Sequence, residues 1–328
     1  MRIGILSAGG DCPGINATIR GVGKTALTHF GMEVIGIKSG FLGLLEEDYL
    51  PLNEEALSGL LSLGGTILGT SREKPFKKSD DGSNDKPQII VENYHKLGLD
   101  CLVCIGGNGT QKTAYKLSQL GLNIIGIPKT IDNDVWGTDI SFGFDTAIDI
   151  ATEAIDRLHS TASSHKRVMI IELMGHHAGW ITLYAGMAGG ADVILLPELG
   201  YDMEIVNRAI LARTAKGKPY SIVAVCEGLN VDDRLIEKGT GLETRKTTLG
   251  YVQRGGSPSA FDRNLATRLG GHATELIVAG KFGRMVCLND NKIDSIPLVN
   301  VAGKTRLVTP DHDLIIQGKR MGISFGTD

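Results

Sequence analysis

Short apolar runs alternate with longer amphipathic stretches along most of the chain. The runs are mostly β-branched and bounded by glycine or proline, as buried strands are. They read RIGILSAGG, MEVIGIKSG, DCLVCIGG, NIIGIPKT, VMIIELMG, DVILLPE and SIVAVCEG. Helical patterns lie between them, such as TAYKLSQLG, DTAIDIATEAIDRLHSTAS and EIVNRAILARTAKG. Near-continuous apolar strands separated by helices predict an α/β fold with a parallel sheet covered on both faces.

Length and charge narrow the class of protein. A chain of 328 residues predicts two domains or one large α/β unit. The net charge of −3 gives no support for binding to nucleic acid or to an anionic membrane surface. We find neither a signal peptide nor an apolar run of transmembrane length, so we expect no membrane association.

The five cysteines show no disulfide framework. Cys101 and Cys104 form a C-x-x-C pair, but the pair lies in a predicted strand. Residues three apart on a strand point to opposite faces, so the two sulfurs should not share a ligand. We expect a reduced, cytoplasmic protein.

Polar and glycine-rich loops follow the predicted strands, where ligands bind in doubly wound sheets. Gly9 and Gly10 follow the first strand, and the loop from Gly106 to Thr110 follows another. Glycines there let backbone N–H groups approach an anion, and the next helix adds a favourable dipole. Two such loops in one sheet favour a polyphosphate ligand.

The stretch GIPKTIDND, residues 126–134, has two interpretations. Its polar residues could form an Asx-turn network that caps a helix, above all at Asp134. Alternatively, Asp132 is a general base that takes a proton from an attacking hydroxyl, and Lys129 supplies positive charge for phosphoryl transfer.

A resemblance favours the second interpretation. The segments GGDCPGINA, GGTILGTSR, GGNGT, PKTIDND, SSHKR, ELMGHHAGW, CEG, ETR and GYVQRGGSPSAFDR resemble, in order, the motifs of the phosphofructokinase A family. NAD kinases and diacylglycerol kinases share G-G-x-G-T but lack the PKTIDND and QRGGSP segments. The resemblance implies the phosphofructokinase fold, with two doubly wound α/β domains and mostly parallel sheets. Residues 1–143 plus about 257–306 would bind the phosphoryl donor, and 144–256 plus about 307–328 the sugar phosphate.

The resemblance also implies roles for individual residues. Those expected to hold the donor are Gly10, Arg72, Gly107, Asn108, Gly109 and Thr110. Those expected to line the sugar site are Thr130, Asp132, Met174, Gly175, His176 and Glu227, with Asp132 as the base beside the sugar's 1-hydroxyl. Those expected to meet the 6-phosphate are Tyr251, Arg254 and, from a neighbouring subunit, Arg167 and Arg245. Such sharing implies a homodimer or homotetramer. Surface ion pairing is the alternative for Arg167 and Arg245.

The donor is either ATP or inorganic pyrophosphate in this family. Pyrophosphate enzymes carry a lysine at the position of Lys129, and Tyr251 points the same way. A lysine there would neutralise charge on a departing phosphate. Gly109 and Arg72 resemble ATP enzymes, because many pyrophosphate enzymes carry an aspartate at the position of Gly109. Weighing these positions, we expect pyrophosphate.

Three departures from the family pattern affect the expectations. Asn108 stands where an aspartate usually associates with Mg²⁺, so the donor's oxygens and water would hold most of the metal. His176 replaces an arginine, which weakens phosphate attraction. His159 replaces an effector-binding arginine, so we expect little allosteric regulation.

The leading hypothesis is therefore a Mg²⁺-dependent, reversible diphosphate–fructose-6-phosphate 1-phosphotransferase of glycolysis and gluconeogenesis. An ATP-dependent 6-phosphofructokinase is the close alternative. A non-catalytic subunit that binds sugar phosphate is the alternative from another class. The polar stretch 71–87 is expected to be a mobile lid or arm, and the C-terminal tail a small surface element.

Overall fold

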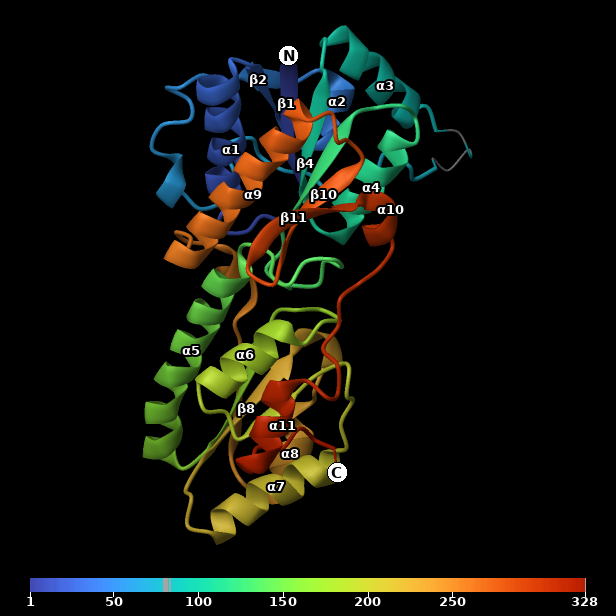
Figure 1. The fold of residues 1–328 in the computed structure, drawn as a ribbon. Helices are drawn as coiled ribbons and strands as arrows, with labels where there is room; N and C mark the ends of the chain where they lie inside the picture. The colour runs from blue at the N-terminus through green and yellow to red at the C-terminus, as the bar shows by residue number, and fades with distance from the viewer. Residues whose placement is uncertain (79–81, 83, 328) are drawn as a thin grey trace. The chain divides into compact units, whose positions relative to one another are not determined.

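The structure, a computed structural model, describes residues 1–78, 82 and 84–327. The chain forms two compact units, each built from separate stretches of sequence (Figure 1). The first unit comprises Met1–Thr130, Asp134–Gly143 and Arg254–Thr305. The second unit comprises Ile131–Asn133, Phe144–Gln253 and Arg306–Asp328. The chain therefore passes from one unit to the other within the PKTIDND stretch.

The sheet of the first unit has, within the described residues, seven strands in the order β11-β10-β5-β4-β1-β2-β3. Their bounds are β1 (Arg2–Ala8), β2 (Glu33–Ile37), β3 (Tyr49–Pro51), β4 (Cys101–Gly106), β5 (Ile124–Pro128), β10 (Arg284–Asn289) and β11 (Lys292–Pro297). The five inner strands are parallel, whereas β3 and β11 pair antiparallel at the two edges.

Helices cover both faces of this sheet. They are α1 (Ile15–Lys24), α2 (Phe41–Glu46), α3 (Lys86–Lys96), α4 (Asn108–Ser118), α9 (Ala260–Val278) and α10 (Leu298–Val301), with short turns η1 (Thr25–His29) and η2 (Leu60–Ser62). Helices α1 and α9 lie side by side (Figure 1). Their close approach needs glycine, because a Cβ on Gly21 would lie 2.9 Å from the carbonyl oxygen of Thr267.

The second unit has a smaller sheet, whose described strands run parallel in the order β7-β8-β6-β9. They are β6 (Val168–Leu173), β7 (Val193–Leu195), β8 (Ser221–Cys226) and β9 (Thr244–Thr248). The helices are α5 (Phe144–His165), α6 (Trp180–Ala188), α7 (Met203–Ala215), α8 (Asp233–Thr240) and α11 (Asp313–Arg320), with η3 (Glu227–Leu229) and η4 (Gly250–Arg254). Helices α5 and α6 pack together, as do α7 and α8.

The predicted α/β class with mostly parallel sheets is confirmed, and each of the seven predicted apolar runs forms a strand. Cys101 and Cys104 are both buried in β4, and burial raises the pKa of both thiols. No helix in the described part of the chain is long and apolar enough to cross a membrane.

The C-terminal tail and the stretch 71–87 differ from the surface segments that the sequence predicts. The tail is not only a surface element, because Phe325 is 1% exposed and Ile315 of α11 is equally buried. These apolar side chains anchor the tail in the second unit. The lid interpretation of residues 71–87 falls partly on 79–81 and 83, which lie outside the described residues, while α3 already begins at Lys86.

Candidate active site

The register of three parallel strands brings the predicted donor-binding loops together. Ala8 at the end of β1 pairs with Gly106 of β4, and Gly106 pairs with Pro128 of β5. The three strands therefore end side by side at one edge of the sheet. The residues that follow are Gly9 and Gly10, the loop 107–110, and Lys129.

A cation and a hydroxyl group flank the first glycine loop. Gly9 has a φ of 87°, a left-handed conformation that favours glycine. A Cβ built on Gly9 would lie 3.9 Å from Lys129 Nζ and 4.0 Å from Thr110 Oγ1. Lys129 is 4% exposed, and its amino group donates a hydrogen bond to the carbonyl oxygen of Gly10. This arrangement of glycine backbone, ammonium and hydroxyl suits a bound phosphate.

Gly10 leaves room for the guanidinium group of Arg254. A Cβ on Gly10 would lie 3.0 Å from Arg254 Cζ and closer still to Nη1. The resemblance implies that Arg254 binds the 6-phosphate. In the structure, Arg254 lies against the donor loop of its own unit. Tyr251, its predicted companion, belongs to the second unit and is 73% exposed. The role of both residues at the 6-phosphate stays a prediction.

Asn108 connects the second glycine loop to the PKTIDND stretch. Its Nδ2 donates to the carbonyl oxygen of Asp134 at 3.1 Å and to Asp134 Oδ2 at 2.8 Å. These acceptors fix the orientation of the amide, so Asn108 Oδ1 points elsewhere. Oδ1 is buried and has no hydrogen-bond partner in the structure as described. Asp134 thus receives hydrogen bonds from the first residue of α4.

The orphaned Oδ1 of Asn108 fits the expected Mg²⁺, because the ion takes oxygen ligands. The described residues contain no group of three or more His, Cys, Asp or Glu side chains that could hold a metal.

Arg72 and Gly109 lie at the border of the donor loops. Thr70 Oγ1 donates to the carbonyl oxygen of Gly9 at 2.7 Å, and Gly9 N donates to the carbonyl oxygen of Ser71 at 2.9 Å. Arg72 follows these contacts directly and is exposed. Gly109 is also exposed, and a Cβ there would meet no described atom within 4 Å. Position 109 is therefore open to a larger side chain or to a ligand.

The predicted base lies on a tightly held part of the PKTIDND stretch. Ile131 and Asn133 are each 3% exposed, and Asp132 between them is half-buried. Asn133 has a φ of 52°, a left-handed conformation that few residues other than glycine tolerate. Ser141 Oγ donates to the carbonyl oxygen of Thr130 at 2.8 Å. The backbone on both sides of Asp132 is thus fixed.

The predicted sugar-site residues of the second unit meet at the ends of β6 and β8. His176 N donates to Glu227 Oε1 at 3.1 Å, and the Sγ of Cys226 lies 3.6 Å from the carbonyl oxygen of His176. A Cβ on Gly175 would lie 2.5 Å from the carbonyl oxygen of Ala178, so this turn requires glycine. The residues from Met174 to His176 and Glu227 therefore form one compact group.

Sequence reasoning missed Gln253. This buried side chain accepts a hydrogen bond from Met174 N at 2.8 Å through Oε1, and so supports the loop 174–176. Gln253 lies in the QRGGSP segment next to Arg254, and its place in this motif was the sequence signal that could have identified it.

Arg167 and Arg245 meet on a carboxylate that was not anticipated. Arg167 Nε lies 2.5 Å from Glu243 Oε2, and Arg245 Nη2 pairs with Glu243 Oε1. Arg167, followed by the charge of Arg245, lowers the pKa of the Glu243 carboxyl. The pairing matches the ion-pair alternative for these arginines, and it also places two guanidinium groups around one anion.

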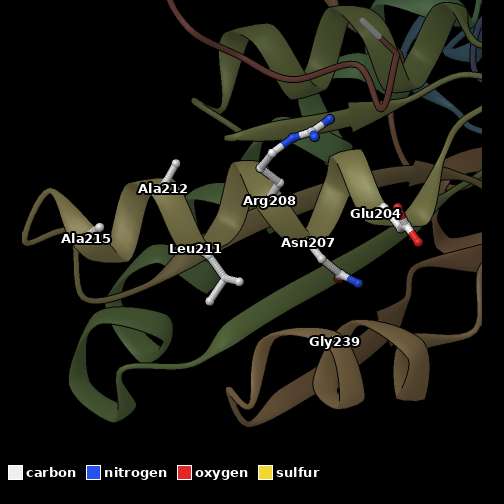
Figure 2. Close-up of a pocket in the computed structure, with 7 residues that line it drawn as sticks. All are labelled: Glu204, Asn207, Arg208, Leu211, Ala212, Ala215 and Gly239. Carbon is white, nitrogen blue, oxygen red and sulfur yellow. The ribbon is translucent and has the colours of Figure 1, made fainter.

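An open pocket of about 630 Å³ lies elsewhere, between α7 and α8 of the second unit. Its lining residues are Glu204, Asn207, Arg208, Leu211, Ala212, Ala215 and Gly239. Figure 2 shows Asn207 pointing toward the helix that carries Gly239, whereas Arg208 points away from it. The pocket is separate from the strand-end loops described above.

Comparison with known proteins identifies the family. The sequence model of the phosphofructokinase family matches residues 2–277. The chain is 66% identical over 336 residues to "ATP-dependent 6-phosphofructokinase 3" of Bacteroides thetaiotaomicron, covering 99% of this chain and 100% of that protein. It is 44% identical to the pyrophosphate–fructose 6-phosphate 1-phosphotransferase of Dictyoglomus thermophilum, covering 94% of this chain and 96% of that protein. The phosphofructokinase structure from Saccharomyces cerevisiae is similar with a TM-score of 0.82 and 32% identity, covering 92% of this chain and 45% of that one. The chain belongs to the phosphofructokinase family.

Proposed function

We propose that this protein transfers a phosphoryl group from ATP to the 1-hydroxyl of fructose 6-phosphate. The observation that carries the choice of donor is the 66% identity, over nearly the whole chain, to a relative named as ATP-dependent. This proposal replaces pyrophosphate, which the sequence favoured, with the donor that the sequence ranked second.

The geometry at Gly109 supports ATP. The space beyond its Cα is open, so the site offers neither a carboxylate to repel the α-phosphate nor a side chain to crowd it. Arg72 follows residues that hydrogen-bond to Gly9, and so it lies near the same loop. A guanidinium group there suits the phosphates of a nucleotide.

The residues at the strand ends account for the chemistry. Asp132 takes the proton of the 1-hydroxyl as that oxygen forms a bond to the γ-phosphorus, and the bond from this phosphorus to the departing ADP oxygen breaks. Lys129 and the backbone N–H groups of the glycine loops stabilise the negative charge of the phosphates. Thr130 and the loop 174–176 orient the sugar. Mg²⁺, held in part by Asn108 Oδ1, would supply further neutralisation of the phosphate charge.

Pyrophosphate remains a second candidate donor because of Lys129. Its amino group lies beside Gly9 and Gly10, where a small inorganic donor would place its leaving phosphate. The 44% identical relative from Dictyoglomus thermophilum is named for this donor.

Initial rates with fructose 6-phosphate and Mg²⁺ test the proposal, with ATP and pyrophosphate compared as donors. We expect ATP to give the higher kcat/KM. A higher kcat/KM with pyrophosphate would replace the first proposal by the second. Binding of fructose 6-phosphate without turnover of either donor would instead support the non-catalytic alternative.

The proposal also includes the regulation and the oligomeric state of the enzyme. We infer weak regulation by nucleotides and phosphoenolpyruvate, because both ring nitrogens of His159 are engaged. Nδ1 lies 3.1 Å from the Tyr220 hydroxyl, and Nε2 lies 2.7 Å from the carbonyl oxygen of Gly189. We also infer a homodimer or homotetramer in which Arg167 and Arg245 serve a neighbouring subunit, and gel filtration with light scattering tests it.

A further inference from the structure

The short stretch 131–133 is held by the second unit although both of its neighbours in sequence belong to the first. Asn133 is buried in a left-handed conformation, which asparagine adopts more readily than most residues and which surrounding contacts can further stabilise. Arg306 provides such support, since its Nη1 donates to the carbonyl oxygen of Asn133 at 3.2 Å. Arg306 thus acts on the residue that follows the proposed base.

Trp180 holds Arg306 in two ways. The guanidinium carbon of Arg306 lies 3.9 Å from the centroid of the indole ring, which is the geometry of a cation–π contact. Trp180 Nε1 donates to the carbonyl oxygen of Arg306 at 3.0 Å. Because Trp180 is only 3% exposed, the arginine stacks on a fixed surface.

Glu198 ties the same two segments together a second time. Its Oε1 accepts a hydrogen bond from Gly179 N at 2.9 Å and another from Val308 N at 3.0 Å. Gly179 immediately precedes α6, and Val308 lies just beyond Arg306. The segment 306–308 is therefore fastened to the start of α6 at both of its ends.

The start of α6 also fixes the sugar-binding loop. Residues 174–176 precede Trp180 by only a few positions, and Ala178 N donates to the carbonyl oxygen of Gly175 at 2.8 Å. One continuous set of contacts within the second unit thus runs from this loop through Trp180 and Arg306 to Asn133.

We propose that Arg306 is a positioning residue for the phosphoryl transfer. It keeps Asp132 in register with the loop 174–176 by joining the carbonyl of Asn133 to the first residue of α6. Arginine suits this role because its planar guanidinium can stack on the indole and still donate in its own plane. This inference rests on the proposed function, in which Asp132 is the base and 174–176 contact the sugar.

The test uses the full-length variants Arg306→Met, Arg306→Lys and Trp180→Phe. We expect Arg306→Met to lower kcat by about 10²-fold, because a small misplacement of a reacting group has that effect. The KM for the donor should stay within about threefold of wild type. Arg306→Lys keeps the charge but loses the planar stack, so its kcat should lie between those of wild type and Arg306→Met. Trp180→Phe keeps an aromatic surface, loses the Nε1 donor and should cause a smaller loss of kcat.

A second readout does not require turnover. Amide hydrogen exchange of peptides covering 129–134, in the absence of substrate, should be faster in Arg306→Met than in wild type. The matched control is Arg268→Met, which removes a similar side-chain bond to a main-chain carbonyl, that of Asn291 at 3.2 Å. The control should leave kcat and the exchange of this stretch unchanged.

The outcomes separate this inference from the proposed function. Unchanged exchange of 129–134 in Arg306→Met overturns the positioning role, whatever the enzyme's substrate proves to be. Faster exchange with an unchanged kcat also overturns it, since the arginine would then order the loop without affecting the reaction. Absence of turnover by the wild type rejects the proposed function, and the exchange data alone then judge whether Arg306 holds the loop. If Arg306→Met fails to fold, Trp180→Phe carries the same two comparisons.

Discussion

The amino group of Lys129 donates a hydrogen bond to the carbonyl oxygen of Gly10, and the lysine side chain is 4% exposed. A buried ammonium group is costly unless it is hydrogen-bonded and close to negative charge. The contact therefore holds a positive charge beside the two glycines where we expect the donor phosphates. Substitution of Lys129 tests whether that charge selects the phosphoryl donor.

Replacing Lys129 by methionine preserves most of the side-chain volume. It removes the positive charge and the hydrogen-bond donor. We expect the pyrophosphate-dependent rate to fall by about 10²-fold, which is the usual effect of removing one hydrogen-bond donor that stabilises charge in the transition state. The ATP-dependent rate should fall less. Steady-state kinetics with each donor measure the difference. Lys112→Met, on an exposed position of α4, is the control. Equal losses with both donors would show that Lys129 does not discriminate between them.

Replacing Gly109 by aspartate tests whether this position permits ATP as the phosphoryl donor. The added side chain points into open space, so the melting temperature should stay close to that of wild type. Its carboxylate should repel the α-phosphate, and we expect kcat/KM for ATP to fall by about 10²-fold. Gly109→Ala adds the Cβ without the charge and should lose much less. An ATP rate that survives the aspartate would exclude charge at position 109 as a donor selector.

Replacing Asp132 by asparagine tests the general base. Removal of the carboxylate should lower kcat by about 10²–10⁴-fold, while the KM for fructose 6-phosphate changes little. The measurement is kcat at saturating donor, with Asp156→Asn on an exposed position of α5 as the control. Wild-type turnover in the Asp132 variant would remove this residue from the catalytic role.

Replacing Glu243 by glutamine releases the arginines that its carboxylate now pairs. If Arg167 and Arg245 bind the 6-phosphate, the carboxylate competes with substrate for them. We therefore expect the KM for fructose 6-phosphate to fall by about two- to fivefold, the range of an exposed ion pair. An increase in KM would show that Glu243 orients the arginines instead of competing for them.

The lowered pKa of the wild-type Glu243 carboxyl determines how the comparison with Glu243→Gln depends on pH. A carboxyl with a depressed folded-state pKa stays ionised above that value, and its ion pairs are lost only as the pH falls through it. The difference in KM between wild type and Glu243→Gln should hence be constant from about pH 7 to pH 8, where the carboxylate is fully charged and a sugar phosphate is mostly dianionic. A difference that varied across this range would mean that another group titrates at the site.

The strands that sequence patterns predicted are apolar runs whose residues are mostly buried. The missed strand β9 reads TRKTT and contains no apolar run, because most of its side chains are exposed to solvent. Strands β10 and β11 were missed for another reason. They are joined at Asp290 and Asn291, whose φ values of 48° and 62° fit a tight hairpin turn, so the DN pair was an unused signal.

The site was predictable where motifs are local and unpredictable where contacts span the chain. The glycine loops and Lys129 each follow a recognisable strand, so their meeting at one sheet edge follows from parallel topology. The contact between Arg306 and Asn133 joins positions 173 residues apart, and nothing in the local sequence around Arg306 indicates it. Glu243 likewise lies in the ETR segment with Arg245, but its pairing with Arg167 depends on the alignment of β6 with β9.

The interleaved segments of the two units also bear on how the chain is made. Strand β5 has β4 on one side and β10 on the other, and β10 ends at Asn289. The ribosome must therefore reach Asn289 before β10 can pair with β5, although β1 has been synthesised long before. The exposed flank of β5 is an unpaired edge during that interval, and such edges attract other chains. Newly made protein should consequently depend on chaperones more than its small, parallel second sheet would suggest.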